Sequence, residues 1–185
     1  MGPNSSNALF FLVTTLFDLY LGALLLRVIL QWVRADFYNP LSQIVWKLTN
    51  PPVLPLRNLI PRWQKLDTAA LAVLLVVAVV YMLLIGWMFG LGIGGLSLVW
   101  YALLKCLVLT INLYTLSLFV QAILSWLGPG VNNPAANILW SMNEPLLRPV
   151  RRFIPSISGL DLSPLVVMLA LQVLNRLIPL PLILR

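Results

Sequence analysis

The chain has 185 residues, of which 61% are hydrophobic and only 9% are charged, and its formal net charge is +7. Charged residues make up about a quarter of an ordinary soluble domain, so this composition indicates an integral membrane protein. The sequence has no His, one Cys and five carboxylates, which leaves little material for a metal cluster, a disulfide framework or a catalytic dyad. We therefore expect no enzymatic activity, no cofactor, no bound metal and no direct contact with nucleic acid.

Four apolar runs are long enough to cross roughly 30 Å of hydrocarbon at about 1.5 Å per residue. They cover about 8–33, 68–90, 96–127 and 162–184. No basic residue precedes the first run, and the run is longer than the apolar region of a signal peptide, so we expect it to remain in the mature protein. The predicted fold class is an all-α membrane protein with four transmembrane helices.

The sequence repeats itself with an offset of 94 residues, the spacing that separates Tyr20 from Tyr114 and Trp32 from Trp126. We interpret the chain as two copies, 1–92 and 93–185, each made of a span, a connector and a second span. The connectors cover 34–67 and 128–161. Two spans return the chain to its starting side, so the copies share one orientation and we expect a pseudo-twofold axis along the membrane normal. The paired motif residues are Asn39-Pro40 with Asn133-Pro134, Pro51 with Pro145, Pro61 with Pro155, and Asp67 with Asp161.

Each connector is expected to contain short helices. Asn39 is a good N-cap and Pro40 suits the first helical position, and the apolar residues that follow have helical spacing (Leu41, Ile44, Val45 and Leu48). A second element is predicted after Pro51 in the first connector, and Pro55 should keep it to about two turns. The second copy repeats this arrangement, with Pro149 in place of Pro55. Asp67 and Asp161 are interpreted as N-caps of the next spans, with a functional carboxylate as the alternative.

The connectors hold eight of the twelve basic residues. The positive-inside rule then places both connectors in the cytoplasm and both termini outside. Amphipathic helices with basic faces and a boundary Trp are typical of the membrane interface. We therefore hypothesise that the connector side chains contact anionic headgroups or a partner, and the alternative is that they only anchor the bundle. The candidates are Arg57, Arg148, Arg151, Arg152, Trp46 and Trp140.

Polar side chains within the spans form a second set of candidates, because charge inside a bilayer is costly. They are Asp18, Tyr20, Arg27, Gln31, Asn112 and Gln121. Asp18 and Arg27 lie nine residues apart, on opposite helix faces, and cannot pair with each other. The polar stripes of the two copies could face each other and line a hydrated path, or they could form a hydrogen-bonded seam. Arg27 is near enough to the cytoplasmic end to extend toward the headgroups.

The doubled motif resembles the YggT (YlmG) family. It reads RADFYNPLSQIVWKLTNPPVLPLRNLIP in the first copy and NNPAANILWSMNEPLLRPVRRFIP in the second, each followed by Leu-Asp. The resemblance covers nearly the whole chain. It implies a multi-pass protein of the bacterial inner membrane without known enzymatic activity. It also implies links to cell division and osmotic stress in bacteria, and to cytochrome b6 maturation and nucleoid organisation in plastids. The first copy departs from the motif where Asn58 and Leu54 stand in place of the second copy's Arg152 and Arg148, so a function of the basic residues should be stronger in the second copy.

Two functions from different classes follow. The first is a non-enzymatic membrane scaffold or assembly factor whose connectors engage anionic lipid, another membrane protein or a second copy of the chain. The second is a small channel or transporter of ions, suggested by Asp18 and Arg27 within the first span.

Overall fold

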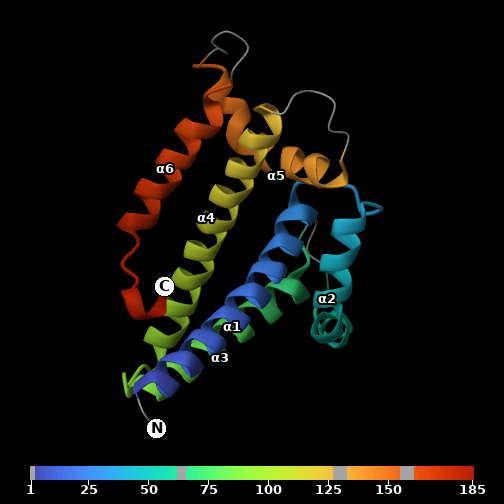
Figure 1. Ribbon diagram of the computed structural model, residues 1–185. Helices are drawn as coiled ribbons and strands as arrows, with labels where there is room; N and C mark the ends of the chain where they lie inside the picture. The colour runs from blue at the N-terminus through green and yellow to red at the C-terminus, as the bar shows by residue number, and fades with distance from the viewer. Residues whose placement is uncertain (1–2, 62–65, 127–132, 155–160) are drawn as a thin grey trace.

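A computed structural model describes residues 3–61, 66–126, 133–154 and 161–185, which form six α-helices and one short 3-10 helix (Figure 1). The all-α fold class is confirmed. Helices α1, α2 and α3 come from the first half of the chain, and α4, α5 and α6 follow in the second half. Their bounds are α1 Pro3–Trp32, α2 Pro40–Arg57, α3 Thr68–Phe89, α4 Leu96–Trp126, α5 Pro134–Arg151 and α6 Ser163–Leu177.

Three helices are long and apolar enough to cross a membrane: α1 over Asn7–Trp32, α3, and α4 over Leu96–Ser125. The predicted fourth span at 162–184 is not one continuous helix. Its helical part, α6, has 15 residues and extends only about 22 Å at about 1.5 Å per residue. Helix α6 ends at Leu177 because Pro179 and Pro181, which lack an N–H group, follow closely.

The segment after α6 turns back onto the bundle. The guanidinium of Arg185 donates hydrogen bonds to the backbone carbonyl oxygens of Asn175 at 2.7 Å and of Ile178 at 3.2 Å. A basic group at this end of a helix satisfies carbonyls that have no partner within the helix and complements the helix dipole. Leu180 and Leu184 are buried against the main core.

The main core lies between α1, α3 and α4. Its largest fully buried apolar side chains include Leu21 and Leu24 of α1, and Tyr81 and Met82 of α3. A smaller cluster joins Leu118 of α4 to Leu147 of α5 and Val167 of α6. Helix α3 packs on both α1 and α4, and α6 packs on α4. Both termini lie toward the end of the bundle that holds the turn between α3 and α4, and α5 lies at the other end (Figure 1).

Local capping signals account for the starts of α2, α3 and α5. Asn39 and Asn133 are N-caps, as predicted, and their side chains accept the amides of Leu41 and Ala135 at 3.0 Å. Asp67 caps α3 by accepting the amide of Ala70 at 3.3 Å, so this prediction is also confirmed.

The N-cap prediction for Asp161 is wrong, because α6 begins one residue later with Leu162 at the cap position. The carboxylate of Asp161 accepts the amide of Ser163 at 2.9 Å without closing a helical turn. Pro61 is exposed and its carbonyl oxygen accepts the Thr68 hydroxyl. Pro155 lies outside the described residues.

The prediction of two short elements in each connector is wrong. Helix α2 runs without interruption through Pro51 and Pro55, and α5 runs through Pro145 and Pro149. A proline removes one backbone hydrogen bond and crowds the preceding turn, which bends a helix but does not have to end it. Packing supplies the compensation, since Val53 of α2 and Leu147 of α5, which lie within these proline-containing turns, are both fully buried.

The two connector helices bury different faces. The predicted apolar stripe of α2 is largely exposed at Leu41, Ile44 and Leu48, and its buried residues are Ser42, Thr49 and Val53. Helix α5 instead buries apolar stripe residues, among them Ile138 and Met142. Helix α2 therefore presents small polar side chains to the bundle and an apolar stripe to its surroundings.

Candidate functional site

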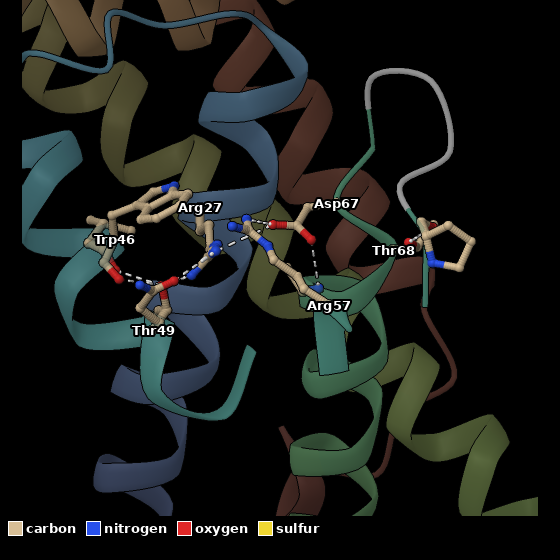
Figure 2. Close-up of polar contacts among 10 residues, drawn as sticks. Arg27, Trp46, Thr49, Arg57, Asp67 and Thr68 are labelled. Atoms are coloured by element: carbon tan, nitrogen blue, oxygen red, sulfur yellow. Dashed lines mark hydrogen bonds and ion pairs between the residues drawn. The ribbon is translucent and has the colours of Figure 1, made fainter. Parts of the chain in front are cut away.

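A buried ionic cluster joins α1, α2 and the start of α3 (Figure 2). The guanidinium of Arg27 donates to the Thr49 hydroxyl at 2.9 Å and to a carboxylate oxygen of Asp67 at 3.3 Å. Arg57, at the end of α2, donates to the same carboxylate oxygen. The side chains of Arg27 and Asp67 are 1% and 0% exposed. Arg27 therefore turns into the bundle, where it contacts α2 and the cap of α3, and the predicted extension toward an exposed surface is not observed.

Trp46 of α2 completes this cluster. The central carbon of the Arg27 guanidinium lies 4.5 Å from the centroid of the indole ring, and that of Arg57 lies 4.7 Å away. A cation over an aromatic face is stabilised by about 0.5 to 2 kcal/mol, with the larger values at desolvated sites. Trp46 thus belongs to a charged cluster, and its ring helps two like charges to occupy one buried region.

The charge balance of this cluster is uneven. Two guanidinium groups, those of Arg27 and Arg57, share the single carboxylate of Asp67. Burial alone would raise the pKa of Asp67, but the hydrogen bond and charge of Arg57, the Ala70 amide and the charge of Arg27 outweigh it, so the pKa is lowered. The trio of side chains consequently carries one positive charge in excess.

The second half has a neutral version of the same contact. Asn143 of α5 donates to the side-chain oxygen of Gln121 on α4 at 2.8 Å, and Ser117 donates to Asn143 at 2.7 Å. Gln121 and Asn143 occupy the positions that correspond to Arg27 and Thr49 in the repeat. All three side chains of this network are buried, so they form a hydrogen-bonded seam between α4 and α5.

The second half also has an ionic group, but this group lies nearer the surface. Arg151 donates to Asp161 at 2.8 Å and to Glu144 at 2.9 Å, and its side chain is 39% exposed. Burial alone would raise the pKa of Asp161, but the bonds from Ser163 and Arg151 lower it overall. Here one cation meets two carboxylates, so this trio has one negative charge in excess, the opposite of the first half.

A further ion pair lies within the spans. The ammonium of Lys105 on α4 lies 2.8 Å from a carboxylate oxygen of Asp18 on α1, and it donates to the Tyr81 hydroxyl of α3 at 3.5 Å. Lys105 is fully buried, whereas the Asp18 side chain is 33% exposed. Asp18 and Arg27 therefore bind different partners, as their opposite helix faces require.

The remaining intramembrane candidates are dispersed. Asn175 of α6 donates to the side chain of Asn112 on α4 at 2.7 Å. Tyr20 packs half-buried against the main core, and Gln31 lines a cavity beside Arg27. In the described residues, the polar side chains of α1 and α4 bind their own connectors or α6 more than each other. Among these residues the contacts resemble the hydrogen-bonded seam more than a path between facing stripes.

The exposed basic candidates lie on and just after α5. Arg148 and Arg152 are exposed, Trp140 is 49% exposed and the neighbouring Phe153 is 83% exposed. No ion pair is observed for Arg148 or Arg152 among the described residues. This surface therefore offers positive charge without an observed ion pair, next to the exposed ring of Phe153.

Sequence reasoning missed Thr49, Asn143 and Lys105. Applying the repeat offset to polar connector residues would have paired Thr49 with Asn143, at the positions that contact the paired Arg27 and Gln121. Lys105 is a lone charge within an apolar run, which is itself a signal. The described residues contain no group of three or more His, Cys, Asp or Glu side chains, and the Cys106 thiol is buried in α4. The polar groups described above hold helices together and present charge.

Comparison with known proteins gives consistent matches over most of the sequence. The family model described as CCB3/YggT matches twice, over residues 6–88 and 100–183, which supports the tandem repeat. An uncharacterized protein of Pseudomonas aeruginosa is 40% identical over 175 residues, covering 94% of this chain and 89% of the relative.

Two further relatives are similar in extent. The uncharacterized protein YggT of Escherichia coli K12 is 39% identical over 170 residues, covering 91% of this chain and 88% of the relative. An uncharacterized protein of Haemophilus influenzae is 36% identical over 173 residues, covering 93% and 91% of the two chains. No solved structure matches the chain.

Proposed function

The chain belongs to the CCB3/YggT family, and from this premise we propose that it is a non-enzymatic scaffold or assembly protein of the bacterial inner membrane. Its connector helices would lie at the cytoplasmic headgroup level and engage anionic lipid together with another membrane protein or a second copy. The observation that carries the proposal is the basic and apolar surface at the end of α5, where Arg148, Arg152 and Phe153 are all exposed.

The described contacts support this role because they hold the surface in place. Asn143 and Leu147 of α5 are fully buried, and Arg151 links α5 to the start of α6 through Asp161. A rigid helix that presents charge and an aromatic ring loses little entropy on binding, which favours affinity. Each exposed arginine near an anionic surface contributes about 1 kcal/mol. Osmotic stress response, cell division and maturation of a membrane complex are the processes in which we would seek the partner.

Photocrosslinking in intact membranes tests the proposal. A photoreactive residue at Phe153 should give a discrete adduct with a partner protein or with a second copy. The same residue at Leu177, which is 73% exposed on α6, is the matched control and should not give that adduct. Combining the probe at 153 with Arg148→Gln and Arg152→Gln should abolish the adduct, because these changes remove charge without touching the ion pairs of Arg151.

The proposal fails if no adduct forms at position 153, or if the adduct persists in the Arg148→Gln, Arg152→Gln background. Reporter fusions at positions 60, 94 and 185 check the orientation independently. A reporter at position 60 that reads as external would contradict the headgroup placement.

A small ion channel or transporter is a second candidate, favoured by the Asp18–Lys105 pair between the long helices. Ionisable groups at this depth mark ion or proton pathways in other membrane proteins. The purified protein in liposomes should then pass ions, with a flux that Asp18→Asn or Arg27→Gln alters. Absence of flux for monovalent cations, anions and protons would exclude this candidate.

A further inference from the structure

We propose that the first half of the chain holds one anionic phospholipid, with its phosphate beside Arg27 and an acyl chain in the apolar groove between the two repeats. This inference rests on the proposed function in one respect, the placement of the connectors at the headgroup level. It adds a specific, stoichiometric lipid site, which is distinct from the exposed surface of α5.

The headgroup part of the site is a cavity of about 230 Å³ between α1 and α2. Arg27, Gln31, Ser42 and Trp46 are among the side chains that line it. One water occupies about 30 Å³ of the liquid, so the cavity has room for a phosphate-sized group. The position of the cavity along the bundle also suits a lipid headgroup. Arg27 pairs with Asp67, which caps the start of α3, and the start of a transmembrane helix lies at the headgroup level.

Two features of this cavity indicate an anionic group. Arg27 belongs to the trio with Arg57 and Asp67, which has one positive charge in excess. The hydroxyl of Ser42 is buried, with 6% of the residue exposed, and it has no hydrogen-bond partner among the described residues. A buried hydroxyl without a partner costs roughly 1 to 3 kcal/mol, and a phosphate oxygen would accept a hydrogen bond from it. Charge-assisted bonds of this kind are the strong ones.

An apolar groove of about 340 Å³ adjoins this cavity and supplies the place for a lipid chain. Leu30 and Val45 line both the cavity and the groove. The groove continues between α1, α2, α4 and α5, where Leu116 and Ile138 are among its walls. A polar, electropositive cavity that opens beside an apolar groove matches the two parts of a phospholipid.

The second half provides an internal contrast. A cavity of about 210 Å³ is lined by Gln121, Trp140, Arg151 and Asp161, and the first two correspond to Arg27 and Trp46 in the repeat. Its ionic trio has one negative charge in excess, because Arg151 pairs with both Asp161 and Glu144. We therefore expect one lipid per chain, held by the first half.

Native mass spectrometry of the full chain in an uncharged detergent tests the inference. The protein is titrated separately with dioleoylphosphatidylglycerol, dioleoylphosphatidylcholine and inorganic phosphate. We expect one phosphatidylglycerol per chain, bound more tightly than phosphatidylcholine, and no comparable binding of inorganic phosphate. Arg27→Gln installs the residue of the second copy. It should lower the affinity for phosphatidylglycerol about tenfold, because one charge-assisted hydrogen bond to the phosphate is lost.

Two further variants keep the test decisive if Arg27→Gln does not fold. Ser42→Leu fills the cavity without removing an observed hydrogen bond, and it should reduce the preference for phosphatidylglycerol in the same direction. Leu116→Trp narrows the groove and should lower the affinity of the chain for both lipids. Leu103→Trp is its control, because Leu103 is also exposed on α4 and lines a separate apolar hollow of about 350 Å³. This variant should bind both lipids with unchanged affinity.

Equal affinity for the two lipids would overturn the inference, as would a preference that both Arg27→Gln and Ser42→Leu leave unchanged. If inorganic phosphate displaces phosphatidylglycerol and Leu116→Trp has no effect, the ligand is free phosphate and the lipid site is refuted. The adduct at position 153 reports on the proposed function separately. If that adduct forms but the wild-type chain shows no preference for phosphatidylglycerol, this inference alone is refuted.

Discussion

Replacing Asp67 with Asn removes a charge from the buried cluster while keeping most of the side-chain shape. The amide oxygen of Asn can still accept the Ala70 amide, so the cap of α3 is retained. Arg27 and Arg57 lose their shared counter-charge, and the excess of this cluster rises from one positive charge to two. Breaking a buried pair by removing one partner costs about 3 to 5 kcal/mol, because an uncompensated charge stays buried.

Asp161→Asn is the matched control in the second half. The side chains of Asp161 and Arg151 are 28% and 39% exposed, and Glu144 remains as a second counter-charge. A partly exposed pair of this kind contributes at most about 1 kcal/mol. The two substitutions make the same chemical change at corresponding positions of the repeat, so a difference between them isolates the effect of burial.

Thermal unfolding in detergent measures this difference, followed by tryptophan fluorescence at one fixed scan rate. A change of 1 kcal/mol shifts Tm by roughly 2 to 4 °C for a chain of this length. We therefore expect Asp67→Asn to lower Tm by about 6 to 20 °C, and Asp161→Asn by no more than about 4 °C. Adding Arg57→Gln to Asp67→Asn should recover part of the loss, because it lowers the excess charge. Equal shifts for the two single variants, or no recovery in the double variant, would refute the reasoning.

Three other outcomes follow from the described contacts. The pKa of Asp67 is lowered on folding, so the stability that its charge contributes is present above the unfolded pKa of about 4 and is lost as pH falls through the lowered folded pKa. The difference in Tm between the wild type and Asp67→Asn should therefore shrink below about pH 4. A difference in Tm that stays constant with pH would contradict this expectation. Asp18→Asn and Lys105→Met should each destabilise the protein by roughly 3 kcal/mol, and the double variant by about 1; additive losses in thermal unfolding would show that the two groups do not interact. Arg34 has a positive φ of 57° just after α1, a conformation that costs about 1 kcal/mol for a residue with a Cβ; Arg34→Gly should therefore raise Tm by roughly 2 to 4 °C, and a lower Tm would contradict the strain argument.

The opposite charge excess of the two halves bears on how the repeats have diverged. The pair Arg57 and Asp67 has its counterpart in Arg151 and Asp161, with the same spacing in the sequence. The first half adds Arg27 to this pair, whereas the second half adds Glu144. The expectation that a function of the basic residues is stronger in the second copy concerns the exposed Arg148 and Arg152, and it stays a prediction. In the corresponding ionic trios, the excess charge is positive and largely buried in the first copy, and negative and partly exposed in the second.

Features that depend on near neighbours in the chain could be read from the sequence. The Asn-Pro starts of α2 and α5 depend on contacts between residues two or three apart, and the long helices follow from continuous apolar runs. The repeat also needs only a comparison of the sequence with itself. Where the local signals competed with packing, as at Pro51 and Pro145, the predicted helix breaks did not occur.

The partners of the charged side chains required the folded chain. Asp67 meets Arg27 from 40 residues away, and Lys105 meets Asp18 from a still more distant segment. Apolar residues surround α1 and α3 on nearly all sides, so the sequence does not indicate which side of each helix faces the bundle. That rotation is set by the packing of α1, α3 and α4 against one another, and with it the choice between a buried ion pair and an exposed charge.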